Sequence, residues 1–120
     1  MKIVIKSKQI YEDYEDEILE SYDAEILYVD NGFKLVYNDT TLYFDGECVF
    51  LKRPNFNLEI RVGIKTISKL ITPYRDIQVE VMGKKINFVK SPFEIDFTYS
   101  IKVGNTEEYI NELQIYDCAI

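Results

Sequence analysis

Strict alternation of apolar and polar residues is the feature that most restricts how this chain can fold. Over residues 93–103, every odd position is apolar and every even position is polar. Residues 56–62 repeat the pattern, and Phe33, Leu35 and Tyr37 follow it too. Side chains of a β-strand point alternately to the two faces, so this period predicts strands with one buried and one solvated face. A helical period does not fit these stretches.

Turn residues separate the strand-like segments at intervals of about 8 to 12 residues, which is typical of a sandwich or a barrel. Asn31-Gly32 and Asp45-Gly46 are the strongest signals, because both central residues of a type I′ turn need positive φ. The other predicted turns are Asn38-Asp39, Arg53-Pro54-Asn55, Met82-Gly83, Ser91-Pro92 and Gly104-Asn105.

Residues 9–20 contain only a thin apolar stripe that a short helix could bury, and we interpret 11–16 as an acidic connection into a strand that starts near Glu17. That strand is expected to bend near Asp23. The sequence then predicts about ten strands, over residues 2–9, 17–29, 33–38, 40–45, 48–53, 56–63, 65–72, 76–82, 84–90, 93–103 and 108–117.

So many strands would leave exposed edges in a flat sheet, and closing the sheet removes them. With 120 residues, of which 47% are hydrophobic, the chain can form one domain with a substantial core. We therefore predict a single all-β domain over residues 1–120, an antiparallel up-and-down β-barrel of about 8–10 strands.

Histidine is absent, which excludes Ser-His-Asp and Cys-His hydrolases and zinc sites that need imidazole. No G-x-S-x-G, Walker A or G-x-G-x-x-G motif occurs. Glu94 and Asp96 lie two residues apart, but on the face that the alternation predicts to be solvated, where nothing would separate their pKa values. We expect a protein that is not an enzyme and that needs no metal or cofactor.

The N-terminus has no apolar segment of a signal peptide, and no apolar run is long enough to cross a bilayer. Cys48 and Cys118 are far apart and form no C-x-x-C motif, so we expect two reduced thiols. These features predict a cytoplasmic protein without membrane contact.

Charge is unevenly distributed along the chain, whose net charge is −7. Residues 1–51 carry −8 (4 basic, 12 acidic), residues 52–90 carry +6 (9 basic, 3 acidic) and residues 91–120 carry −5 (1 basic, 6 acidic). The basic middle either binds an anionic partner or lies beside acidic strands when the barrel closes. Overall acidity disfavours nucleic acid as a partner.

The acidic run at residues 12–17 is the most conspicuous local cluster. It lacks the D-x-[DN]-x-[DN]-G spacing and the glycine turn of a calcium loop. A solvated segment is therefore the simpler interpretation.

Four parts of the chain carry a resemblance to a known family: residues 17–39, Asp45-Gly46-Glu47 leading to Leu51-Lys52-Arg53, Ile71-Thr72-Pro73-Tyr74, and residues 99–115. Together they resemble the YwiB-like family, a bacterial domain of unknown function with an antiparallel calycin-like (lipocalin-like) β-barrel. The resemblance covers roughly residues 15–117 and departs from the pattern at Pro54-Asn55 and Arg75, where glycines are expected. It implies a barrel of the kind that often holds small apolar ligands, and it transfers no catalytic residue.

Tyr37 and Tyr99 are the polar groups that the alternation directs into the barrel, where a phenol could bind a ligand carboxylate or hydroxyl. Arg61 is a third candidate, although the alternation predicts it on the solvated face. The first hypothesis is that the barrel binds a small apolar, amphipathic or anionic ligand through Tyr37, Arg61 and Tyr99. The alternative is a filled barrel that acts through its outer surface, as a homodimer or a protein-interaction module.

Overall fold

A computed structural model describes residues 1–118, and these form eleven strands. No helix occurs among them. The strands are β1 (Lys2–Ile10), β2 (Glu15–Asp23), β3 (Glu25–Val29), β4 (Gly32–Tyr37), β5 (Thr40–Phe44), β6 (Val49–Arg53), β7 (Phe56–Ile60), β8 (Lys65–Ile71), β9 (Asp76–Val89), β10 (Glu94–Val103) and β11 (Tyr109–Asp117).

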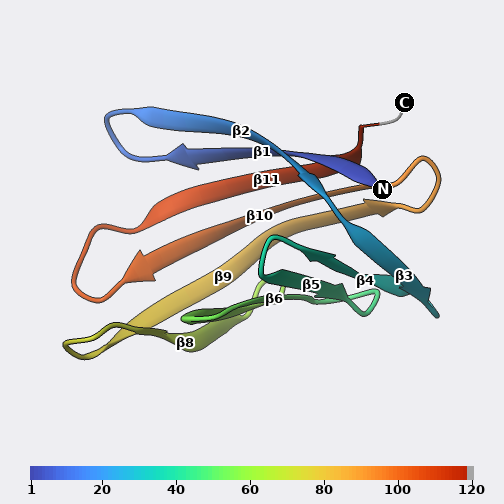
Figure 1. Cartoon of the computed structure of the whole chain (residues 1–120). Coiled ribbons are helices and arrows are strands. Elements are labelled where there is room, and N and C mark those ends of the chain that lie inside the picture. The colour runs from blue at the N-terminus through green and yellow to red at the C-terminus, as the bar shows by residue number, and fades with distance from the viewer. Residues whose placement is uncertain (119–120) are drawn as a thin grey trace.

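The strands form one antiparallel sheet in the order β2-β1-β11-β10-β9-β8-β7-β6-β5-β4-β3. The two edge strands, β2 and β3, are consecutive in sequence, so the sheet curls back toward itself as a half-barrel (Figure 1). The predicted all-β antiparallel barrel is confirmed at this level, with eleven strands instead of 8–10. The hairpin tips β1–β2, β8–β9 and β10–β11 project together beyond the short strands β4–β6 (Figure 1).

The predicted bend in the first long acidic strand is confirmed, and it lies at Ala24. The backbone N–H of Ala24 donates to Met1 O (2.7 Å), and the Met1 ammonium donates to Ala24 O (3.1 Å). The chain therefore leaves β1 at this point and continues along β4. β2 begins at Glu15, two residues earlier than predicted, which shortens the acidic connection.

The interior of the half-barrel is packed with apolar side chains from both its short and its long strands. The alternation in β10 places Ile95, Phe97, Tyr99 and Ile101 inside, each at most 3% exposed. Burial of this apolar area is the main force that holds the curled sheet together. The largest fully buried side chains are Phe33, Phe97, Ile3, Leu35, Leu42, Ile60, Ile95, Ile115, Val49, Val79 and Val81.

The predicted turn at Met82-Gly83 is wrong, because β9 runs unbroken through it. The register with β10 shifts between Thr98 and Tyr99, which oppose Lys85 and Gly83, so the strand contains a bulge. The Gly83 N–H donates to Arg61 O at 2.9 Å, and a Cβ at Gly83 would lie 2.5 Å from that oxygen. The glycine permits a close backbone approach and does not end a strand.

The predicted Asp30-Asn31-Gly32 turn is confirmed, but its central pair is not Asn31-Gly32 as predicted. Asp30 and Asn31 form the turn, and Gly32 pairs with Val29 as the first residue of β4. A Cβ at Gly32 would lie 1.7 Å from Phe44 O, so this glycine also serves a close approach. The Asn38-Asp39 turn is confirmed, with φ values of 40° and 63°.

Replacing Gly83 with alanine is expected to lower the free energy of unfolding by about 1–3 kcal/mol, the usual cost of overpacking. The added methyl group would force β9 away from the Arg61 backbone, which is held by two backbone hydrogen bonds in this region. Urea denaturation measures the change. Gly63→Ala is the comparison variant. A Cβ at Gly63 would have no atom within 4 Å, but φ is +76°, so its effect on stability comes from backbone conformation and not from lack of space. A neutral Gly83→Ala variant would contradict the close packing.

Candidate ligand-binding cleft

A cleft of about 310 Å³ opens at the end of the half-barrel where β2 faces the β4–β5 and β6–β7 turns. One wall comes from β1, β2 and β11, and the other from the two turns and the residues beside them. Apolar and polar groups are mixed in this cleft, which suits an amphipathic molecule. The lining residues are Ile5, Ser7, Glu20, Tyr22, Tyr37, Asn38, Asp39, Thr40, Arg53, Pro54 and Leu113.

Tyr37 lies at the base of the cleft with its phenol buried and without a hydrogen-bond partner. It is the last residue of β4, and its side chain is 4% exposed. Burial raises the pKa of Tyr37, and the nearby Arg53 guanidinium opposes that rise. No hydrogen bond of normal geometry joins the two groups, so Tyr37 Oη remains unpaired. Buried polar atoms rarely stay unpaired, and a group entering the cleft would satisfy this one.

Arg53, the last residue of β6, places a cation at the rim of the cleft. Its side chain follows Leu51 on the inner face, whereas the adjacent Lys52 is on the outer face. Three ion pairs join described residues, and Arg53 takes part in none of them. Its charge is therefore available to an anion. The sequence places Arg53 in the basic middle segment that could bind an anion, but not with the two tyrosines, because it lies at a strand end beyond the clear alternation.

Tyr99 and Tyr37, both predicted from the alternation, are brought to the same interior end of the half-barrel. Burial raises the pKa of Tyr99 to about 12, and Tyr37 contributes to that rise. Asn111 Nδ2 donates to Tyr99 Oη at 2.8 Å, while Asn111 Oδ1 is buried without a partner. Asn111 is two residues before Leu113 on the same face of β11, so this second unpaired atom lies next to the cleft.

Arg61, the third predicted residue, is not brought together with the two tyrosines. It lies beyond the end of β7 with its side chain 39% exposed, and its Nη2 donates to Glu59 Oε1 at 2.9 Å. The outward position that the alternation predicted for Arg61 is the one observed. The cation near Tyr37 and Tyr99 is Arg53, which affects the pKa of both phenols.

Glu20 and Tyr22 form the wall of the cleft that belongs to β2. Tyr22 Oη donates to Glu20 Oε2, and this hydrogen bond is the main cause of a raised Tyr22 pKa. The Tyr22 ring packs against that of Tyr37, with centroids 5.5 Å apart. Glu20 is exposed and keeps its second oxygen for another donor. The cleft thus has a carboxylate on one wall and a guanidinium on the other.

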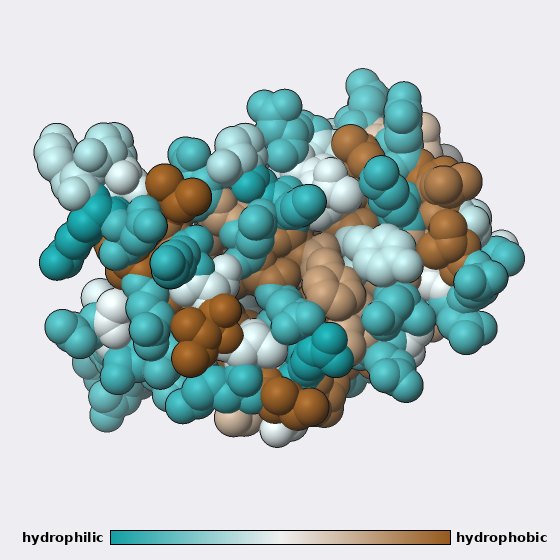
Figure 2. Space-filling model, turned by 90° about the horizontal axis from the view of Figure 1, so that it is seen from below, coloured by the Kyte–Doolittle hydropathy of each residue, from teal (hydrophilic) through white to brown (hydrophobic). Residues whose placement is uncertain are grey.

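A second, more apolar slot of about 220 Å³ lies in the outer wall between β7 and β8. These strands share one register pair, Phe56↔Leu70, and the hydroxyl of Ser68 donates to Asn57 O beside it. Tyr43, Phe50 and Ile67 line the slot. It contains no buried unpaired polar side-chain atom. Exposed apolar side chains elsewhere are scattered among hydrophilic ones on the face in Figure 2.

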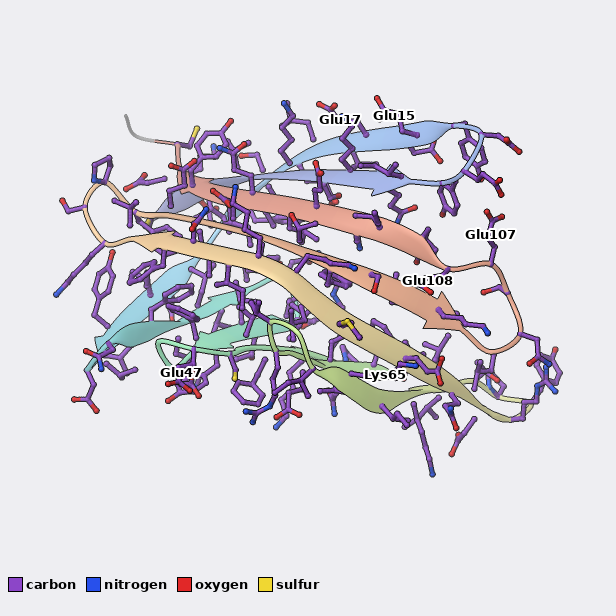
Figure 3. All side chains as sticks on the ribbon, turned by 180° about the vertical axis from the view of Figure 1, so that it is seen from behind. Glu15, Glu17, Glu47, Lys65, Glu107 and Glu108 are labelled. Atoms are coloured by element: carbon purple, nitrogen blue, oxygen red, sulfur yellow. The ribbon has the colours of Figure 1, made fainter. Side chains whose placement is uncertain are left out.

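The acidic run near the N-terminus is solvated, and part of it is neutralised by β1. Glu17 pairs with Lys6 at 3.5 Å and Glu15 with Lys8 at 3.4 Å on the outer face of β2. Figure 3 shows Glu15 and Glu17 projecting away from the rest of the half-barrel. Within residues 1–118, no three Cys, Asp or Glu side chains are grouped as metal ligands would be.

The basic middle segment lies partly beside acidic side chains. Lys65 and Lys84 share a shallow outer groove with Glu80 and with Glu108 of the acidic C-terminal flank. None of the ion pairs found among the described residues joins this segment to either flank. Lys65 and Lys84 therefore lie near acidic side chains, but no ion pair of the described residues joins them.

Both cysteines are free thiols, of which Cys48 is buried and Cys118 is exposed. The part of the chain that the structure describes has no helix that could span a membrane.

No family model and no curated protein matches this sequence. One solved structure is similar, the crystal structure of the ywiB protein from Bacillus subtilis, with a TM-score of 0.64 and 12% sequence identity. The similarity covers 96% of this chain and 89% of that protein. The predicted resemblance is thereby confirmed at the level of the fold: the chain has a YwiB-like all-β architecture.

Proposed function

We propose that this protein binds a small amphipathic molecule with an anionic group in the cleft beside β2, and that it does so in the cytoplasm without catalysing a reaction. Tyr37 Oη carries the proposal, because it is buried, unpaired and next to the Arg53 cation. An anion there would accept hydrogen bonds from both groups, and charge-assisted hydrogen bonds are the stronger kind. Ile5 and Leu113 would contact the apolar part of the ligand.

The proposed site is at the end of the barrel, not in its centre. The centre is filled by Phe97, Ile115 and other fully buried side chains. A calycin-like protein with a filled centre could also act only through its outer surface, which is the alternative function. Tyr37 Oη and Asn111 Oδ1 are both buried without a hydrogen-bond partner, and this favours ligand binding. A module that acts only through its outer surface would not need unpaired polar atoms in its interior.

Binding of anilinonaphthalene sulfonate, an anionic aromatic dye, tests the proposal by fluorescence titration. The dye is expected to bind, and Arg53→Gln is expected to weaken binding by about tenfold or more, as loss of a charge-assisted hydrogen bond would. Tyr37→Phe is expected to weaken it by roughly fivefold.

Lys52→Gln is the matched control, because Lys52 is adjacent to Arg53 in sequence but lines the outer slot. Arg61→Gln removes another exposed cation far from the two tyrosines. Both controls are expected to bind the dye as the parent protein does. Absence of binding, or a loss with Lys52→Gln equal to that with Arg53→Gln, would reject the cleft as the site.

A further inference from the structure

The cleft carries opposite charges on its two walls, and these charges do not neutralise each other directly. Glu20 comes from β2 and Arg53 from the end of β6, and both line the same space. Both also influence the pKa of Tyr37, which lies between the two walls. Within the described residues, no ion pair joins Glu20 to Arg53. Each charge is therefore open to a ligand group of the opposite sign.

Glu20 differs from the other carboxylates of β2 in where it points. Glu15 and Glu17 are on the outer face and pair with lysines of β1. Glu20 opposes Ile5, a buried residue of the inner face, and therefore faces the cleft. Tyr22 Oη donates to one of its oxygens, which orients the carboxylate and leaves the other oxygen for a donor.

We infer that the ligand is a zwitterion, of the class of amino acids with an apolar or aromatic side chain. This rests on the proposed function and specifies its ligand. The carboxylate of the amino acid binds Arg53 and Tyr37 Oη, and its ammonium group binds Glu20. The side chain lies on Ile5 and Leu113. Cleft volume agrees, since about 310 Å³ is at the lower end of the range for small-molecule sites.

L-phenylalanine and hydrocinnamate test the inference, because they differ only in the amino group. Their dissociation constants are measured by NMR titration of the full chain. Glu20→Gln is expected to weaken binding of phenylalanine by about tenfold while hydrocinnamate binding stays the same or becomes tighter. Glu20 is exposed, so the variant is expected to fold. Glu17→Gln, on the outer face of the same strand (Figure 3), is the matched control and is expected to change neither affinity.

Equal effects of Glu20→Gln on both compounds would overturn the zwitterion inference. So would binding of hydrocinnamate without phenylalanine, or Arg53-dependent dye binding with neither compound bound, and all these results leave the anion site itself intact. Failure of the dye to bind would instead reject the proposed function itself.

Discussion

Phe33→Ala is expected to lower the free energy of unfolding by about 3–5 kcal/mol, the range for removing a large buried aromatic side chain. Phe33 is 0% exposed and belongs to β4, on the short-strand side of the half-barrel. Its ring centroid lies 5.1 Å from that of Phe88 in β9 and 5.0 Å from that of Phe93. These contacts join the short strands to the long ones where no backbone pairing does. Their loss would therefore weaken the packing between the two sides of the half-barrel.

Phe50→Ala is the control for this prediction. Phe50 lies half-buried on the outer wall and packs against Tyr43, with centroids 6.0 Å apart. Its truncation removes comparable atoms without opening a cavity inside the half-barrel, so a smaller loss is expected. Phe33→Leu, which fills most of the space, should give an intermediate value. Urea denaturation with a common m-value supplies the comparison. If Phe33→Ala cost no more than Phe50→Ala, the interior cluster would not hold the sheet as described.

Stability is expected to fall steeply between about pH 10 and pH 12, and Tyr99 supplies a large part of that loss. Burial raises its pKa to about 12 in the folded protein, from an ordinary value of 10.0. Above pH 10 the unfolded chain releases the phenolic proton while the folded protein retains it, so rising pH favours unfolding. The full contribution is present below pH 10 and is lost as the pH approaches 12. A difference of two pKa units corresponds to roughly 2–3 kcal/mol.

Tyr99→Phe isolates this contribution, because phenylalanine has no proton to lose. The variant starts with a lower stability, since Asn111 Nδ2 loses its acceptor, but its stability should decline less from pH 10 to 12 than that of the parent. Tyr74, which is 95% exposed, provides the control variant Tyr74→Phe. Thermal or urea unfolding across this pH range gives the slopes. Parallel curves for the parent and Tyr99→Phe would contradict the burial of this phenol.

Alternation predicted the inward residues well, because side-chain direction in a strand follows from local geometry. Phe97, Tyr99 and Leu35 are buried as residues 33–37 and 93–103 indicated. Glycine was harder to interpret. Gly83 is within a strand and Gly32 begins one, since each is required by a backbone from a distant part of the chain. A local pattern carries no information about such an approach, and a turn was the natural prediction.

The site was predicted only in part for the same reason. Tyr37 and Tyr99 follow the alternation and were predicted to point inward. Arg53 and Glu20 join them only because the chain bends at Ala24 and carries β2 across to the β4–β5 and β6–β7 turns. That closure depends on the order of eleven strands, which a single sequence does not specify. Arg61 lies on the solvated face, as the alternation indicated, and Arg53 is the cation beside the two tyrosines.

Mapping of amide chemical shifts during titration with anilinonaphthalene sulfonate tests the central claim most directly. If the ligand site is the cleft beside β2, the largest changes will fall on Glu20, Tyr22, Tyr37, Arg53 and Leu113. Tyr43, Phe50 and Ile67, which line the outer slot, will change little. Changes concentrated at the outer slot, with the cleft residues unaffected, would contradict the account.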